Sequence, residues 1–137
     1  MADTVEFELV APEELLFSEP VELVVVPGAE GDFGVLPGHS PLISTLRTGV
    51  IAVYENDAVN RRIFVSGGFA EVTPERCTVL ADEAVALETA DRASIEERVK
   101  ADREAVDAAD EADKDNAVSA LAVSEALLAA LDTAGQA

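Results

Sequence analysis

The segment with the densest set of chemically distinctive residues runs from Pro27 to Leu42 and reads PGAEGDFGVLPGHSPL. It holds four glycines and three prolines in sixteen residues, together with Glu30, Asp32 and the chain's single histidine, His39. This composition requires tight turns of defined conformation. A phosphate-binding loop would need Gly-Lys-Ser/Thr, or a glycine-rich turn that opens into a helix. Neither is present, so the segment predicts a rigid loop instead of a nucleotide site.

His39 could act in catalysis only beside an orienting carboxylate and a nucleophile or bound substrate. The sequence offers no Ser-His-Asp order and no cluster of metal ligands around it. A histidine that fixes the turn or contacts a partner is therefore favoured. The single cysteine, Cys77, has no second thiol to pair with and is expected to be a small buried residue in a strand. We predict no catalytic residue, no metal ligand and no cofactor.

Acidic residues gather near the C-terminus in a way that superficially resembles a cation site: Asp107, Asp110, Glu111, Asp113 and Asp115. A calcium loop places oxygen ligands at positions 1, 3 and 5 around a central glycine. Here three aspartates recur every third residue, which is helical spacing. The run therefore predicts the solvated face of a helix.

The charge of the whole chain excludes several classes of partner. Its 28 acidic and 9 basic residues give a net charge of −19 and a pI near 4.1. Such a field repels nucleic acid and anionic lipid surfaces. The N-terminal Met1–Glu8 has no basic stretch before an apolar run, so no signal or transit peptide is expected. The longest uncharged apolar run, Leu23–Pro27, is too short to span a bilayer, so no direct membrane insertion is expected.

Short apolar runs separated by turn residues extend from Thr4 to about Asp82 and predict roughly nine strands of a sandwich or barrel. Apolar and acidic residues alternate from Val5 to Leu9, which is typical of a strand with one buried face. Glu55, Asn56 and Asp57 separate two such runs and predict a hairpin connection.

Beyond Glu88 the composition becomes rich in Ala, Glu and Asp, which favours helix. We expect a first helix from about Asp91 to Ala112, with Ser94 and Glu97 as a capping box. A polar interruption at Asp113–Asn116 would then precede a second helix. Four residues predict its apolar side: Val118, Leu121, Leu128 and Leu131. The small residues Ala120 and Ser124 would face the first helix. The expected fold is a β-sandwich domain over residues 1–88 followed by an antiparallel α-helical hairpin over 89–137, which is mainly β plus two helices.

Two motifs carry a resemblance to a known family. The Pro27–Leu42 segment is similar to the Gly-Asp-Phe-Gly-Val-Leu-Pro-Gly-His signature of the epsilon subunits of F-type rotary ATP synthases. The segment Phe64–Val72, FVSGGFAEV, resembles the second motif of that family, and its paired glycines predict a bulge or a tight reversal. The order of a strand-rich half and an Ala-rich two-helix tail also matches, so the resemblance covers almost the whole chain.

This resemblance implies a non-catalytic subunit of the central stalk, or rotor, that takes part in proton transport and ATP synthesis. Its partners would be the gamma subunit and the c ring, with the alpha and beta subunits as further contacts of the C-terminal helices. The implied location is peripheral, on the cytoplasmic side of the bacterial inner membrane. Carried over by motif position, the interface with gamma and the c ring would use Glu30, Gly31, Asp32, Phe33, His39 and Ser40, in loops at one end of the sandwich.

The C-terminal tail departs from relatives whose helices inhibit ATP hydrolysis through basic residues. Residues 91–137 hold 12 acidic and 5 basic residues, a net charge of −7, and no Lys or Arg follows Lys114. We therefore expect weak or absent inhibition. Some relatives bind ATP through an Ile/Leu-Asp-x-x-Arg-Ala motif. Here Leu87–Ala93 has Glu in place of Asp and one residue too many, so ATP binding is not expected.

Two other classes of function stay open at this point. An acidic adaptor would dock a basic partner through an exposed apolar stripe at Leu121, Leu128 and Leu131. A ligand-binding β-barrel would need several inward histidines or carboxylates, and the single histidine argues against a metal-binding barrel.

Overall fold

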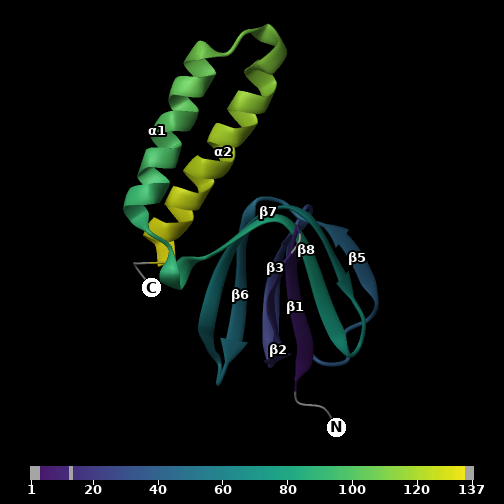
Figure 1. The fold of residues 1–137 in the computed structure, drawn as a ribbon. Coiled ribbons are helices and arrows are strands. Elements are labelled where there is room, and N and C mark those ends of the chain that lie inside the picture. Colours follow the sequence, from purple (N-terminus) through teal and green to yellow (C-terminus); the bar gives the residue numbers. More distant parts are fainter. Residues whose placement is uncertain (1–3, 13, 135–137) are drawn as a thin grey trace. The chain divides into compact units, whose positions relative to one another are not determined.

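A computed structural model describes residues 4–12 and 14–134 of the chain, and Figure 1 shows its fold. The chain divides into two compact units between Glu88 and Thr89. The first unit contains the strands, and a short 3-10 helix, η1, at Leu87–Thr89 spans the boundary. The second unit is a pair of helices, α1 at Arg92–Ala108 and α2 at Glu111–Ala134. Strands followed by two helices confirm the predicted fold class.

The described residues form eight strands in one continuous hydrogen-bonded sheet that is folded over on itself. The strands are β1 Val5–Ala11, β2 Glu14–Val21, β3 Leu23–Gly28, β4 Gly31–Val35, β5 Leu42–Thr45, β6 Gly49–Glu55, β7 Ala58–Val72 and β8 Arg76–Ala86. Their order is β2-β1-β8-β7-β6-β3-β4, and β5 pairs with β7. All pairs are antiparallel except β1 with β8, which is parallel.

The core of the sandwich follows from the alternation of apolar residues along each strand. Val5, Phe7 and Leu9 are buried while Glu6 and Glu8 point away from them, as the period of two requires. Valines and isoleucines of β3, β6, β7 and β8 complete one contiguous cluster. Cys77 is fully buried in this cluster, as predicted. In the described part of the sandwich the cluster consists of apolar side chains and this thiol.

Strand β7 is the longest, with 15 residues, and it serves two neighbours on one edge. Its first half pairs with β6 and its last four residues pair with β5, while β8 runs along its other edge. Gly67 and Gly68 lie between these halves with φ of 68° and 100°. The strand continues through the two glycines and its register with β8 does not shift there, so the bulge or tight reversal predicted there is wrong. Because the runs on either side belong to one strand, the described residues form eight strands instead of nine.

The hairpin predicted around Glu55–Asp57 is confirmed. Glu55 pairs with Ala58, which leaves Asn56 and Asp57 as a two-residue turn. Both have positive φ, 55° and 65°. This is the conformation of the turn that matches the twist of a β-hairpin, and Asn and Asp tolerate it better than most residues.

The ends of the two helices differ from the predicted ones. Asp91 caps α1, because its carboxylate accepts hydrogen bonds from the Ala93 amide at 3.3 Å and the Ser94 hydroxyl at 2.7 Å. Ser94 with Glu97 is therefore not the capping box. The helices separate at Ala109 and Asp110, and the Asp110 carboxylate accepts from the Asp113 amide at 3.1 Å. The interruption predicted at residues 113–116 is wrong, because Asp110 starts the second helix earlier.

The two helices lie side by side as an antiparallel hairpin (Figure 1). Ile95 and Val99 of α1 are buried, and so are Ser124 and Leu127 of α2. The prediction for Ser124 is thus confirmed, whereas Ala120 is exposed. Val118 is 48% exposed, and Leu127 is more deeply buried than the predicted Leu128. The apolar side of α2 is therefore rotated relative to the predicted one.

Candidate interaction surfaces on the sandwich

The first candidate surface is the acidic turn, which we define as Ala29–Asp32 between β3 and β4. Gly28 pairs with Gly31, so Ala29 and Glu30 form the tip. Glu30 is exposed, and Gly31 has a φ of 138°, which favours glycine. A Cβ on Gly28 would lie 2.9 Å from the Phe33 ring and 2.8 Å from the Gly31 carbonyl oxygen. Phe33 thus packs over the base of the turn and against the core, and supports the turn from within.

The second candidate surface is the loop from Leu36 to Pro41, which follows β4 and contains His39 and Ser40. The Gly38 amide donates to the Pro74 carbonyl oxygen at 2.8 Å, which fastens this loop to the connection between β7 and β8. His39 Nδ1 lies 2.6 Å from the Ser40 carbonyl oxygen, so this nitrogen carries the proton and donates. His39 therefore orders its own loop, in agreement with the favoured interpretation. Ser40 is exposed.

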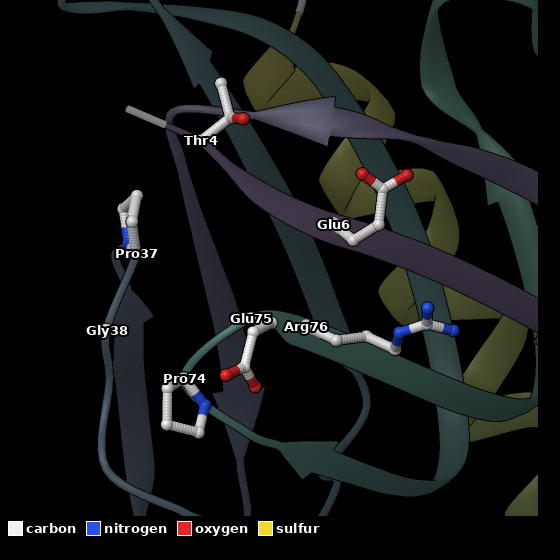
Figure 2. Close-up of a pocket in the computed structure, with 7 residues that line it drawn as sticks. All are labelled: Thr4, Glu6, Pro37, Gly38, Pro74, Glu75 and Arg76. Atoms are coloured by element: carbon white, nitrogen blue, oxygen red, sulfur yellow. The ribbon is translucent and has the colours of Figure 1, made fainter. Parts of the chain in front are cut away.

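A groove of about 560 Å³ lies where this loop meets the end of the sandwich (Figure 2). Seven residues line it, and they come from β1 and the residue before it, the loop, the β7–β8 connection and the first residue of β8: Thr4, Glu6, Pro37, Gly38, Pro74, Glu75 and Arg76. The Glu6 amide donates to the Glu75 carbonyl oxygen at 3.0 Å, which closes its floor. The groove is broad, and among its lining residues it presents two carboxylates and one guanidinium.

The structure does not bring the six predicted interface residues together. Glu30 and Asp32 lie at the end of β4 that joins β3, whereas His39 and Ser40 lie beyond its other end. Five residues of extended strand span about 17 Å. The sequence predicted one surface formed by these loops at one end of the sandwich. The structure instead has two separate surfaces, one at each end of β4.

A third surface was not predicted from the sequence. We call it the outer apolar row, and it consists of Val10, Leu15, Ile43, Phe69 and Leu80. In register, Leu15 pairs with Val10, Val10 with Leu80, and Leu80 with Phe69, and Ile43 lies on the neighbouring strand β5. These side chains occupy strand positions opposite to the buried ones. Four of them are large and exposed: Ile43 at 69%, Leu15 at 59%, Phe69 at 43% and Leu80 at 37%.

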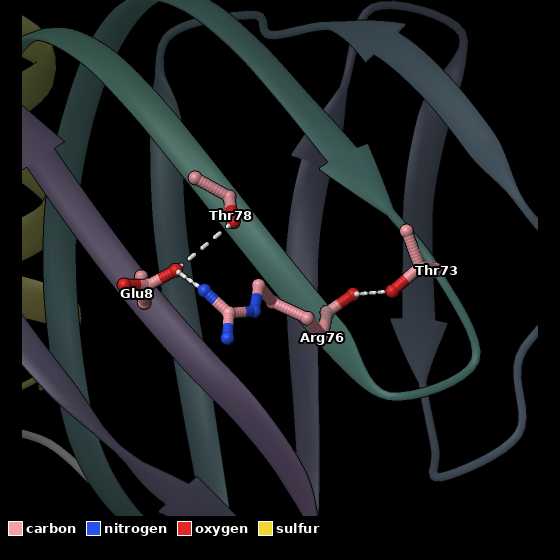
Figure 3. A network of polar contacts seen from close by, with 4 residues as sticks. All are labelled: Glu8, Thr73, Arg76 and Thr78. Carbon is pink, nitrogen blue, oxygen red and sulfur yellow. Dashed lines mark hydrogen bonds and ion pairs between the residues drawn. The ribbon is translucent and has the colours of Figure 1, made fainter.

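Polar side chains flank the outer apolar row on the same face of the sheet. Glu8 Oε1 accepts from Arg76 Nη1 at 2.7 Å and from the Thr78 hydroxyl at 3.3 Å (Figure 3). Glu8 and Thr78 are the residues next in the outward-facing series after Val10 and Leu80. A contiguous apolar strip with a polar border is typical of surfaces that contact another protein.

Comparison with known proteins identifies the family. Residues 4–87 match the family described as ATP synthase, Delta/Epsilon chain, beta-sandwich domain. The chain is also 59% identical to the ATP synthase epsilon chain of Rhodospirillum rubrum over 131 residues, which cover 95% of this chain and 98% of the relative. The chain belongs to the ATP synthase epsilon chain family. The resemblance inferred from the two glycine-containing motifs is thereby confirmed.

Other relatives extend the similarity across the helical tail of this ATP synthase subunit. The epsilon chain of Paramagnetospirillum magneticum is 48% identical over 132 residues, which cover 96% of this chain and 99% of the relative. A chain of the Euglena gracilis mitochondrial ATP synthase, from a structure of its OSCP/F1/c-ring part, superposes with a TM-score of 0.77 at 30% identity, covering 96% of this chain and 83% of that one. A chain of the Tetrahymena thermophila central stalk and c ring shares the fold, with a TM-score of 0.57 at 12% identity.

The acidic-adaptor function considered above would require an exposed apolar stripe on the helical hairpin. The hairpin exposes fewer apolar side chains than this function requires. Leu121, Leu128 and Leu131 are partly buried in this unit instead of forming an exposed stripe. By length and composition, Glu111–Thr133 is the one helix of the described residues that could cross a membrane, although its apolar content is largely alanine. Among the described residues, no group of three or more His, Cys, Asp or Glu side chains could hold a metal ion.

Two structural features of these surfaces were not predicted from the sequence. The outer apolar row is assembled from five different strands, so no local sequence pattern predicts it. Arg47, which contacts both sides of the acidic turn, lies outside both motifs. A local signal did exist for part of the row: Phe69 and Leu80 alternate with buried neighbours, Ala70 beside Phe69 and Val79 and Ala81 beside Leu80.

Proposed function

We propose that this ATP synthase subunit is a non-catalytic rotor component that couples proton flow to ATP synthesis by contacting the gamma subunit and the c ring. The outer apolar row is the observation that carries the proposal. Exposed apolar side chains in a contiguous strip are costly in water and gain stability when a partner covers them. A stiff sheet that presents such a strip suits the transmission of torque, because hydrogen bonds between the strands keep the residues of the strip at fixed positions relative to one another.

In this proposal the outer apolar row faces gamma. The acidic turn and the loop of His39 and Ser40 extend the contact toward gamma and the c ring. Glycines and hydrogen bonds to neighbouring connections hold both loops rigidly, and rigid loops on a scaffold are common binding elements. The subunit would reside on the cytoplasmic side of the bacterial inner membrane through these partners, without inserting α2 into the bilayer.

The proposal is tested with the purified full chain and ATP synthase depleted of its own epsilon subunit. Reassembly is followed by size-exclusion chromatography, and coupling by ATP-driven proton pumping in liposomes. Phe69→Ser and Leu80→Ser should weaken reassembly at least tenfold and reduce pumping. Val118→Ser, which removes an equally exposed apolar residue from the hairpin, should leave both unchanged. Unimpaired reassembly of both row variants would contradict a role for the row.

The same system tests the regulatory part of the proposal. The acidic hairpin should inhibit ATP hydrolysis weakly or not at all, since an acidic partner surface would repel it. Deletion of residues 91–137 is then expected to change the ATPase rate of the reassembled enzyme little. A sharp rise in that rate would contradict the proposal. Equilibrium dialysis of the full chain should likewise detect no tight binding of Mg-ATP.

A further inference from the structure

Arg47 lies just beyond β5 and reaches across the base of the acidic turn. We propose that Arg47 is a positioning residue that fixes the acidic turn and leaves Glu30 as the single carboxylate free to meet a cationic group on the partner. This inference rests on the proposed function, since it concerns how one of the proposed contact surfaces is presented. It names a residue outside both sequence motifs.

Three contacts join Arg47 to the turn. Its backbone amide donates to the Pro27 carbonyl oxygen at 3.0 Å. Its guanidinium donates through Nη1 to the Gly28 carbonyl oxygen at 2.7 Å and forms an ion pair through Nη2 with Asp32. Pro27 and Gly28 belong to β3 and Asp32 belongs to β4, so one side chain bridges both strands of the hairpin.

The backbone of the residues before Arg47 also contacts the turn and its base. The Ala29 amide donates to the Thr45 carbonyl oxygen at 2.9 Å, and Gly28 forms a bridge with Leu46. The segment from Thr45 to Arg47 therefore supports the turn along its length. Without the guanidinium, only two backbone hydrogen bonds would join the turn and its base to this segment, those donated by the Ala29 and Arg47 amides.

The contacts of Arg47 also decide the charge of the turn. Glu30 and Asp32 are both exposed, but Asp32 is neutralised by Arg47, whereas Glu30 has no hydrogen bond or ion pair among the described residues. The turn thus presents one uncompensated negative charge at its tip. A planar guanidinium can bind a carboxylate and a carbonyl oxygen together, which an ammonium group does less well.

A purely stabilising role is a weak explanation for this arrangement. The side chains of Arg47 and Asp32 are 45% and 58% exposed, and exposed ion pairs contribute little to folding. What the contacts do restrict is the conformation of the turn relative to the sheet. Restriction of a binding loop before contact lowers the entropy lost on association.

The test uses the full chain in two measurements. Hydrogen exchange of the Ala29 amide in the free chain reports the order of the turn. The Kd for reassembly with epsilon-depleted ATP synthase reports the contact. Arg47→Ala should speed the exchange of Ala29 and weaken reassembly about tenfold, at an unchanged thermal midpoint. Arg47→Lys should restore part of both. Arg103→Ala, which removes an exposed ion-paired arginine of the hairpin, is the matched control and should affect neither.

A double-mutant cycle separates the inference from the proposal on which it rests. Glu30→Gln should weaken reassembly on its own, and Arg47→Ala should then add little, because Arg47 contributes to reassembly only by positioning the Glu30 carboxylate. Unchanged exchange of Ala29 in Arg47→Ala, or fully additive losses of affinity, would overturn the positioning role alone. If Glu30→Gln and Arg47→Ala both leave reassembly intact while exchange speeds up, the turn is ordered by Arg47 but is no contact surface, which overturns both proposals for this turn.

Discussion

Arg92, in the first turn of α1, forms an ion pair with Asp132, in the last turn of α2, and so closes the open end of the helical hairpin. The hydrogen bond to Asp132 raises the pKa of the Arg92 guanidinium. Further along, Arg103 Nη2 lies 3.1 Å from Glu125 Oε2. At the tip, Lys114 donates to the Val106 carbonyl oxygen at 2.9 Å. Charged side chains thus join the helices at three levels.

The first prediction concerns these ion pairs. A double variant, Arg92→Ala with Arg103→Ala, should speed hydrogen exchange of the α2 amides at low salt. The difference from the natural chain should vanish in 1 M salt, where the screening length is about 3 Å. Lys100→Ala removes the same charge from α1, but Lys100 has no ion pair or hydrogen bond among the described residues, so this control should exchange like the natural chain. Salt-independent exchange of the double variant would argue against electrostatic closure.

A second prediction concerns the small apolar contact between the helices. Leu127 is 1% exposed and lies within the second unit, where few large side chains are buried. Leu127→Ala should cost about 2–5 kcal/mol, the range for a buried leucine. The helical circular dichroism of residues 89–137 should then melt at a lower temperature. Val118→Ala, at a 48% exposed position, should cost less than about 0.5 kcal/mol.

The hairpin shows which parts of a helical unit a sequence reveals. Its existence and its α1 contacts through Ile95 and Val99 were predictable, because composition and spacing are local signals. The position of the break was not, since Asp110 and Asp113 are both plausible starts for a helix. Only the geometry decides that the Asp110 carboxylate caps α2. The buried side of α2 also differs from the predicted side, because Val118 is exposed and Leu127 is buried.

The third prediction compares two glycines with positive φ. Gly68 has a φ of 100°, and a Cβ there would collide with the Leu80 carbonyl oxygen. Gly38 has a φ of 85° but open space around it. Gly38→Ala should therefore cost about 1–2 kcal/mol from backbone strain alone. Gly68→Ala should cost clearly more and broaden the NMR signals of β7 and β8. Equal losses in urea unfolding would show that the collision is relieved by movement of β8.

The fourth prediction concerns Cys77. Burial raises the pKa of this thiol from 9.0 to about 12. Above pH 9 the unfolded chain loses the thiol proton while the folded chain keeps it, so stability should fall as pH rises from 9 toward 12. At pH 10 the loss is roughly 1.4 kcal/mol relative to pH 7.5. Urea unfolding of the natural chain and of Cys77→Ala at both pH values isolates this contribution. An identical pH dependence in the two chains would contradict it.

The surfaces of the sandwich were less predictable than its core. The alternation of apolar and acidic residues along β1 and the turn at Asn56–Asp57 each depend on a few consecutive residues, so both are visible in the sequence. The outer apolar row joins Val10, Leu80 and Phe69, which lie up to 70 residues apart in sequence and meet only through strand register. The six motif residues were predicted as one site, but β4 separates them. Pairing across a sheet, and not local pattern, decides which exposed residues become neighbours.

The parallel pairing of β1 with β8 has a consequence for how the chain is made. Phe7 lies beside Cys77 in this pair. The first strand, β1, therefore has no neighbour on that side until the last strand, β8, has been synthesised. Until Arg76–Ala86 emerges, the nascent sandwich has an open edge and an uncovered apolar face, the state most exposed to misassociation. The helices are synthesised afterwards and contain mainly local contacts, which form rapidly. The helices follow β8 in the chain, so the sheet can close while they are being synthesised.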